Sequence, residues 1–141
     1  MPESRFLAAC DSDFQRARQF AAEYSVKAYR DVEEVIAQSG LHSLNVCTPH
    51  PLHAGPAVKT AQAGVHVLIE KPLASSLEDC DAILTAANKS GVKIGTVGQR
   101  RFYAPCQRIR RAIDEGKIGC LVLGSVAMYG WRDQAYHKSD P

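Results

Sequence analysis

The sequence predicts an α/β protein with a Rossmann-like, doubly wound parallel sheet, and three observations support this prediction. Short apolar runs alternate with segments of helical spacing, which is the pattern of strands joined by helices in a mostly parallel sheet. Glycines stand where several of these helices would end. The composition, 45% hydrophobic and 23% charged over 141 residues, is typical of a globular chain of about one domain.

Six strands are expected from the short apolar runs. In chain order they are residues 6–10, 27–29, 44–47, 66–69, 93–97 and 120–129. In the segments between them, apolar residues recur every three or four positions and so share one helical face. The clearest sets are Phe14, Ala17, Ala21 and Tyr24, then Val32, Val35 and Ile36, and then Cys80, Ile83, Leu84 and Ala87. A last helix over residues 103–115 would turn Cys106, Ile109 and Ile113 toward a core.

Capping residues mark the helix boundaries. The glycines that follow helical segments are Gly40, Gly64, Gly91 and Gly116. Two pairs have the three-residue offset of an N-cap and its reciprocating acid, namely Asp31 with Glu34 and Ser76 with Asp79. Arginines gather after Val97, so we expect a first domain over residues 1–98 and the start of a second over residues 99–141.

Charge and cysteine content exclude several classes of protein. Seventeen Lys and Arg against fifteen Asp and Glu leave a formal charge of +2, far below the concentrated positive charge of nucleic-acid-binding proteins. The five cysteines are widely spaced and never in a C-x-x-C pair, so neither a disulfide framework nor a zinc site is indicated, and the cytoplasm is the expected compartment. No apolar run is long enough for a membrane span or a signal peptide.

Polar residues follow four of the predicted strands. They are Asp11, Thr48 with Pro49, Glu70 with Lys71, and Gln99 with Arg100. In doubly wound sheets, ligands bind outside the carboxyl ends of the strands, which open at one edge. We therefore expect these residues to surround a single ligand site.

Asp11 stands between a strand and a helix, where dinucleotide-binding folds place an acid that accepts hydrogen bonds from the adenosine ribose. A helix N-cap is the alternative interpretation, although Ser12 or Asp13 could share that role. If Asp11 binds the ribose, its charge would repel a 2′-phosphate and so favour NAD over NADP.

Residues 47–53 place a hydroxyl, two imidazoles and two prolines between a strand and a helix. They form either a ligand-binding turn or a rigid connection with surface histidines, and spacing alone favours the second. No metal site is indicated, because His50 and His53 lack a third ligand at suitable spacing.

Glu70 and Lys71 end an apolar strand, and Pro72 stops it. An ammonium group held in a cleft at a strand end can donate a hydrogen bond to a substrate hydroxyl or exchange a proton with it. A surface ion pair at a turn is an alternative of similar weight. Further along, Trp131, Arg132 and Tyr136 are suited to stacking on a sugar, but an ordinary loop is equally compatible.

Two motifs taken together resemble those of the glucose–fructose oxidoreductase, inositol dehydrogenase and MocA (Gfo/Idh/MocA) family. They are T-P-x-x-L-H at residues 48–53 and A-G-x-H-V-x-x-E-K-P at residues 63–72. The resemblance continues to Trp131 and Arg132 and so covers nearly the whole chain. It implies NAD(P)-dependent hydride transfer at a carbinol carbon of a sugar, an inositol or a nucleotide-sugar.

The resemblance also implies roles for particular residues. Lys71 would be the catalytic proton shuttle, and the Lys71–Pro72 peptide bond would be cis, as it often is in the family. The residues implied to bind NAD are Asp11, Thr48, Pro49, His53, Glu70, Lys71 and Gln99. The residues implied to face the substrate or the partner domain are Arg101, Trp131, Arg132 and Tyr136. Residues 99–141 would begin the α+β substrate domain of a homo-oligomer.

The sequence departs from the family pattern in two respects. The family's first strand and its G-x-G-x-x-G turn, which holds the pyrophosphate, have no counterpart, so we expect a gap between the strands ending at Cys10 and Cys47. The chain also ends soon after the second domain begins, without the downstream catalytic Asp or His. We therefore expect an internal piece of a longer reading frame that binds NADH poorly by itself.

A non-catalytic relative, used in nucleotide sensing or assembly, is the competing hypothesis. The missing glycine turn and second domain favour it. Thr48 and Pro49, together with Glu70 and Lys71, favour an enzyme.

Overall fold

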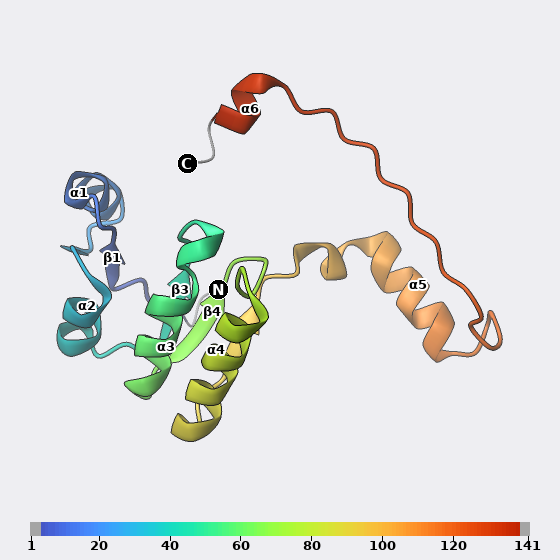
Figure 1. Ribbon diagram of the computed structural model, residues 1–141, viewed down its shortest axis with the longest axis horizontal. Helices are drawn as coiled ribbons and strands as arrows, with labels where there is room; N and C mark the ends of the chain where they lie inside the picture. Colours follow the sequence, from blue (N-terminus) through green and yellow to red (C-terminus); the bar gives the residue numbers. More distant parts are fainter. Residues whose placement is uncertain (1–3, 139–141) are drawn as a thin grey trace. The chain divides into compact units, whose positions relative to one another are not determined.

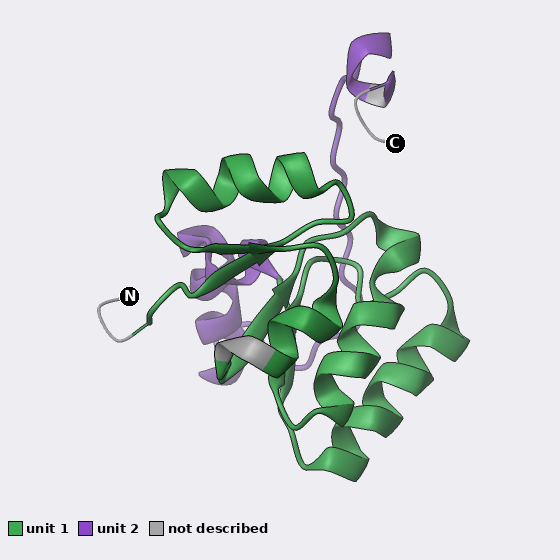
Figure 2. Cartoon of the chain, turned by 90° about the vertical axis from the view of Figure 1, so that its left-hand side faces the viewer, with its two compact units in different colours: residues 1–97 green, residues 98–141 purple. Residues whose placement is uncertain are grey.

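Two groups of parallel strands, with helices packed against them, make up residues 1–97 (Figures 1 and 2). The structure is a computed structural model that describes residues 4–138. In chain order this first unit contains β1 (Ala8–Cys10), α1 (Phe14–Glu23), β2 (Lys27–Tyr29), α2 (Val32–Ser39), β3 (Ser43–Val46), the 3₁₀ helix η1 (His50–Leu52), α3 (Ala54–Gln62), β4 (His66–Ile69), α4 (Leu77–Ser90) and β5 (Ile94–Thr96). The predicted alternation of strands and helices, and with it the α/β fold class, is confirmed.

The strands of this unit fall into two separate sheets. β1 pairs with β2, while β3, β4 and β5 form a three-stranded sheet, and each pairing among the described strands is parallel. β1 and β3 are not paired with each other, which confirms the gap expected from the missing family strand. Across this gap, Lys59 on α3 donates a hydrogen bond to Glu33 on α2, and this bond lowers the pKa of the Glu33 carboxyl group.

Local capping explains where the helices begin and end. Asp31 Oδ1 accepts a hydrogen bond from the Glu34 backbone N–H at 2.9 Å, and Ser76 Oγ accepts one from the Asp79 N–H at 3.1 Å. The four predicted glycines, Gly40, Gly64, Gly91 and Gly116, all have positive φ angles. The left-handed conformation costs a side-chain-bearing residue about 1–2 kcal/mol, so glycine is the favoured residue there.

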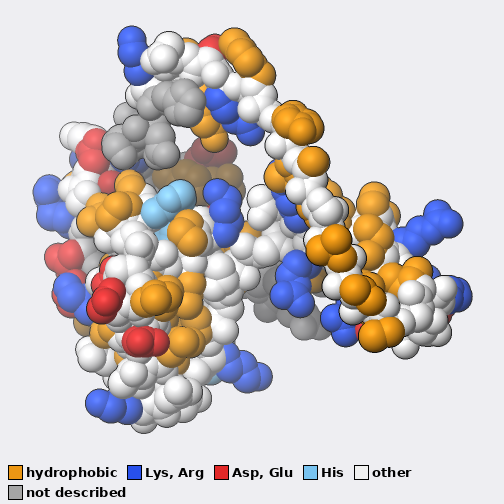
Figure 3. All heavy atoms as spheres, turned by 45° about the vertical axis from the view of Figure 1, so that its right-hand side comes forward, with side chains coloured by type: hydrophobic (Ala, Val, Ile, Leu, Met, Phe, Trp, Pro, Cys, Tyr) orange, Lys and Arg blue, Asp and Glu red, His pale blue; other side chains and the backbone are white. Residues whose placement is uncertain are grey.

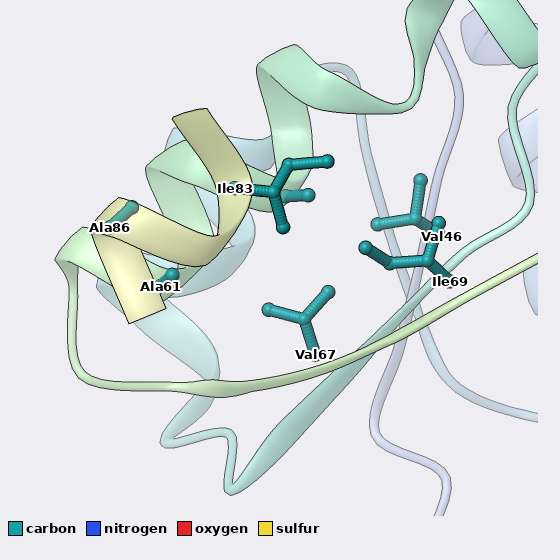
Figure 4. Packing of buried hydrophobic residues seen from close by; sticks show 7 residues of the cluster. Val46, Ala61, Val67, Ile69, Ile83 and Ala86 are labelled. Carbon is teal, nitrogen blue, oxygen red and sulfur yellow. The ribbon is translucent and has the colours of Figure 1, made fainter. Parts of the chain in front are cut away.

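The core lies between the three-stranded sheet and helices α3 and α4 (Figure 4). Its buried members are Val46, Ala57, Ala61, Val67, Ile69, Ile83 and Ala86. Alanines on the facing sides of α3 and α4 let the two helices pack closely, and Ile69 and Ile83 fill the space against the sheet. This packing holds the carboxyl ends of β3 and β4, where the predicted site residues begin.

The second unit, residues 98–141, contains the 3₁₀ helix η2 (Gln99–Phe102), α5 (Ala104–Asp114) and α6 (Gln134–Lys138). The predicted helix over 103–115 is confirmed as α5. The strand predicted over 120–129 is not formed, because a strand needs a hydrogen-bonding neighbour and the described part of this unit contains no other strand. Along residues 4–138, none of the helices is both long and apolar enough to span a bilayer.

Apolar side chains of the second unit are largely exposed, contrary to prediction. No residue of α5 is buried, so Cys106, Ile109 and Ile113 do not reach a core within this chain. Leu123, Val126 and Tyr129 are also almost fully exposed, and hydrophobic side chains line this segment in Figure 3. The amphipathic pattern of α5 therefore gives a helix without a covered apolar face among the described residues.

Candidate functional site

The turns that follow β3 and β4 lie side by side at the carboxyl edge of the three-stranded sheet. Val46 and Ile69 are partners in the parallel register, and the Glu70 N–H donates a hydrogen bond to the Val46 carbonyl at 2.9 Å. Thr48 and Pro49 come shortly after Val46 in the chain. The structure therefore places the T-P turn next to the E-K-P turn, as the parallel sheet predicts.

His53 joins these two turns from the interior. Its side chain is 0% exposed. The ring Nδ1 lies 2.9 Å from the carbonyl oxygen of Pro72, and Nε2 lies 2.9 Å from that of Thr48. His53 is thus not a surface histidine, and each of its ring nitrogens lies within hydrogen-bond distance of a backbone carbonyl.

Glu70 and Lys71 differ in exposure. The Lys71 side chain is exposed and that of Glu70 is half-buried. The Lys71 N–H donates a hydrogen bond to Glu70 Oε2 at 3.1 Å, and the Lys71–Pro72 peptide bond is cis, as the resemblance implies. The ammonium group is accessible to a ligand, although the described residues do not enclose it in a cleft.

The carboxylate of Glu70 influences the turn after β3. Partial desolvation raises the pKa of the Cys47 thiol, and the negative charge of Glu70 raises it further. Glu70 therefore adds negative charge between the T-P and E-K-P turns. A cofactor lying along this edge would meet this charge beside Lys71.

Asp11 does not cap a helix. The N-cap of α1 is Asp13, whose carboxylate accepts hydrogen bonds from the backbone N–H groups of Gln15 and Arg16. Asp11 Oδ1 accepts a hydrogen bond from the Asp13 N–H at 2.9 Å, and its Oδ2 lies 3.5 Å from Arg16 Nη1. The N-cap interpretation of Asp11 is therefore wrong, and its second carboxylate oxygen faces the highly exposed Arg16.

Negative charge accumulates where β1 ends. The pKa of the Cys10 thiol is raised from 9.0 to about 11, first by partial desolvation and then by the charges of Asp31, Asp11, Glu34 and Glu33. The same carboxylates would repel a 2′-phosphate in this region.

We expect the Cys10 thiol to react about tenfold more slowly with iodoacetamide than an ordinary exposed thiol at about pH 8. A pKa raised by about two units lowers the thiolate fraction about a hundredfold. The greater nucleophilicity of a more basic thiolate recovers roughly tenfold of this. Mass spectrometry of the alkylated peptides over time measures the rate, and the exposed Cys120 is the internal reference. Equal rates at Cys10 and Cys120 would contradict the raised pKa of the Cys10 thiol.

The remaining predicted residues belong to the second unit. Gln99 begins η2, and Arg101, also on η2, accepts a hydrogen bond at its carbonyl from Gln107 Nε2. The Arg132 guanidinium lies over the Tyr136 ring, 4.8 Å from its centroid, and Arg132 Nη1 donates to the Trp131 carbonyl at 2.8 Å. Arg132 and Tyr136 are thus in side-chain contact, whereas Trp131 takes part through its backbone carbonyl, and all three side chains are exposed.

Sequence reasoning missed the acidic surroundings of β1 and the part played by Arg16. The spacing of Arg16 from Asp11, five residues across the start of a helix, could have indicated their contact. A surface depression between α3 and α4, with Val58, Glu78 and Lys89 among its lining residues, involves none of the predicted site residues. Within residues 4–138, no group of three or more His, Cys, Asp or Glu side chains could hold a metal ion.

Parallel strands with alternating helices, an acid after β1 and polar turns after β3 and β4 are the features of a Rossmann-type dinucleotide-binding domain. The chain belongs to the Gfo/Idh/MocA oxidoreductase family, which has an NAD-binding Rossmann fold and whose family model matches residues 1–98.

Several characterised proteins are similar to this chain. The 1,5-anhydro-D-fructose reductase of Ensifer adhaerens is 35% identical over 84% of this chain and 38% of that protein. Inositol 2-dehydrogenase 1 of Saccharopolyspora erythraea is 34% identical over 85% of this chain and 36% of that protein. The crystal structure of the WlbA dehydrogenase from Bordetella pertussis, in complex with NADH and UDP-GlcNAcA, superposes with a TM-score of 0.80 at 30% identity, covering 84% of this chain and 36% of that one. The chain thus spans little more than a third of the length of these relatives.

Proposed function

We propose that this chain is the cofactor-binding part of an NAD-dependent dehydrogenase that acts on a carbinol carbon of a sugar, an inositol or a nucleotide-sugar. The observation that carries the proposal is the juxtaposition of the T-P turn with Glu70 and the exposed Lys71 at the carboxyl edge of the sheet. Membership of the family and the names of its relatives, a sugar reductase and an inositol dehydrogenase, support the substrate class.

The residues of the chain fit the two ends of the dinucleotide. Asp11 offers a carboxylate oxygen to the adenosine ribose, and its acidic surroundings suit a ribose without a 2′-phosphate. Thr48, Pro49 and Glu70 would lie along the nicotinamide half. The sequence has no G-x-G-x-x-G turn for the pyrophosphate, so we expect weak binding by this chain alone.

Proton transfer is assigned to Lys71. NAD, when bound, supplies the hydride chemistry. The Lys71 ammonium would donate a hydrogen bond to the substrate oxygen in reduction, and in oxidation the amine would take the hydroxyl proton. Glu70 would help to orient the lysine through the bond that its carboxylate accepts from the Lys71 backbone. Gln99 would bind the cofactor, and Arg101, Trp131, Arg132 and Tyr136 would contact the substrate.

A titration of the isotopically labelled chain with NADH, followed by NMR, tests the cofactor assignment even if binding is weak. Backbone signals near Asp11, Thr48 and Lys71 are expected to shift, and those of the depression between α3 and α4 are expected to remain in place. Adenosine alone should move only the signals near Asp11. The absence of shifts at millimolar NADH, or shifts confined to the α3 and α4 depression, would refute the proposal.

Replacing Asp11 by serine is expected to change the ratio of NADPH to NADH affinity in favour of NADPH by about tenfold or more, equivalent to at least about 1.4 kcal/mol. The change removes the ribose ligand and leaves Arg16, whose guanidinium lies 3.5 Å from the Asp11 carboxylate, to pair with a 2′-phosphate. Parallel NMR titrations with the two nucleotides give the ratio.

The matched control for this variant is Asp81→Ser, which removes an exposed carboxylate from α4. It should leave the ratio unchanged. If the Asp11→Ser variant kept the same ratio of NADPH to NADH affinity as the unmodified chain, Asp11 would not belong to the cofactor site.

A non-catalytic, nucleotide-sensing role is the second candidate. It predicts adenosine binding near Asp11 without any catalytic requirement for Lys71. The lysine variant described in the Discussion separates the two functions.

A further inference from the structure

Among the histidines whose burial the structure describes, His53 is unusual because it is completely buried. It stands at the N-cap position of α3, directly after η1, and α3 is anchored in the core by the buried residues Ala57 and Ala61. Its side chain makes no N-cap hydrogen bond to its own helix. Both ring nitrogens are instead directed at backbone carbonyls of the two neighbouring turns.

The nature of the two partners determines what the ring must donate. A carbonyl oxygen only accepts hydrogen bonds, so each ring nitrogen at 2.9 Å from a carbonyl needs a hydrogen of its own. A neutral imidazole carries one N–H, whereas an imidazolium carries two. If the ring carried a single proton, the lone pair of the unprotonated nitrogen would face a lone pair of a carbonyl oxygen. Because His53 is 0% exposed, this repulsion would not be relieved by solvent.

The two carbonyls belong to the turns that carry the proposed site. The Pro72 carbonyl directly follows Lys71, and the Thr48 carbonyl lies in the T-P turn. The His50 ring meets the His53 ring edge-on, with 5.6 Å between centroids. The other ionisable groups on the two turns are Cys47, Glu70 and Lys71, and the raised pKa of Cys47 keeps its thiol neutral. On α3, Lys59 pairs with Glu33.

We propose that His53 is a positioning residue that carries both ring protons and ties the E-K-P turn to the T-P turn. Nδ1–H donates to Pro72 and Nε2–H donates to Thr48, and the anchored helix α3 holds the ring between them. The consequence for catalysis, a fixed separation between Lys71 and the cofactor groove, rests on the proposed function. The two-donor tie itself is a property of the folded chain.

NMR of the chain labelled with ¹⁵N-histidine tests the tie without cofactor or turnover. The His53 ring is expected to show two slowly exchanging N–H signals, one on each ring nitrogen. Exposed histidines such as His50 should show no such pair. Loss of these two N–H signals in the His53→Asn variant assigns them to His53. A His53 ring with a single proton would overturn the proposal, and that result would leave the dehydrogenase proposal standing.

Two matched variants test whether the tie positions the turns. His53→Asn has one amide group, which cannot span both carbonyls as the imidazole does, so the backbone signals of Thr48 and Lys71 are expected to shift while those of β1 and β2 do not. His50→Asn, three residues earlier on the same connection, should leave both His53 ring protons in place. Unmoved Thr48 and Lys71 signals in His53→Asn would overturn the positioning role. If that variant does not fold, the ring-proton measurement on the unmodified chain decides the question.

Discussion

Replacing Lys71 by methionine is expected to lower kcat for carbinol oxidation by about a hundredfold to ten-thousandfold, the usual contribution of a positioned general acid or base. Methionine keeps a long, unbranched side chain but cannot exchange a proton. Because the Lys71 side chain is exposed and the peptide bonds around it are held by Glu70 and His53, we expect the fold to be unaffected. The measurement is steady-state reduction of NAD by a polypeptide of the full length of the relatives that carries this segment.

Lys93→Met is the matched control for this variant. Lys93 is also exposed, but it directly precedes β5 and so lies at the opposite, amino end of the strands. Its replacement should leave kcat within about twofold, since surface changes away from a site have small effects. If the Lys71 variant kept the unmodified kcat, Lys71 would be discarded as the proton shuttle. The non-catalytic function would then become the better account of the chain.

Replacing Ile83 by alanine is expected to lower the free energy of unfolding by about 2–5 kcal/mol. Ile83 on α4 is 0% exposed and packs toward the sheet residues Val67 and Ile69 and toward α3 (Figure 4). Its neighbours on α3 and α4 include the alanines Ala61 and Ala86, whose short side chains cannot move into the space left behind. Most of the cavity therefore remains, and the lost contacts are not replaced. Urea denaturation followed by far-UV circular dichroism gives the difference.

The adjacent residue offers a control with the same change in chemistry. Leu84→Ala removes the same number of carbon atoms from the same helix, but Leu84 is 46% exposed. Its replacement should cost less than about 1 kcal/mol. Equal losses in the two variants would mean that Ile83 does not pack as the structure shows.

Much of the fold was predictable because its signals are local. Asp31 and Ser76 cap helices through hydrogen bonds to residues three positions away, and glycines such as Gly40 and Gly91 end helices through their own positive φ angles. Short apolar runs such as residues 66–69 form strands in which every second residue is buried. Such interactions are contained within a few residues, so the sequence displays them directly.

The candidate site was predictable in part. The rule that parallel strands end at one edge placed Thr48 beside Glu70 and Lys71. The role of His53 was not predictable, because a histidine near a turn looks the same in sequence whether its ring faces water or two carbonyls. The failure of the strand at 120–129 has a related cause. An apolar, extended segment becomes a strand only when another strand lies beside it.

The amino-acid sequence therefore determined the type and order of the local elements, their caps and the residues at the strand ends. Tertiary structure alone decided that residues 120–129 form no strand, that the charges of carboxylates from two segments act on Cys10, and that His53 lies between Thr48 and Pro72. The physical reason is the range of the interactions. Backbone conformation and capping depend on adjacent residues, whereas strand pairing, burial and charge clustering depend on segments that only folding brings together.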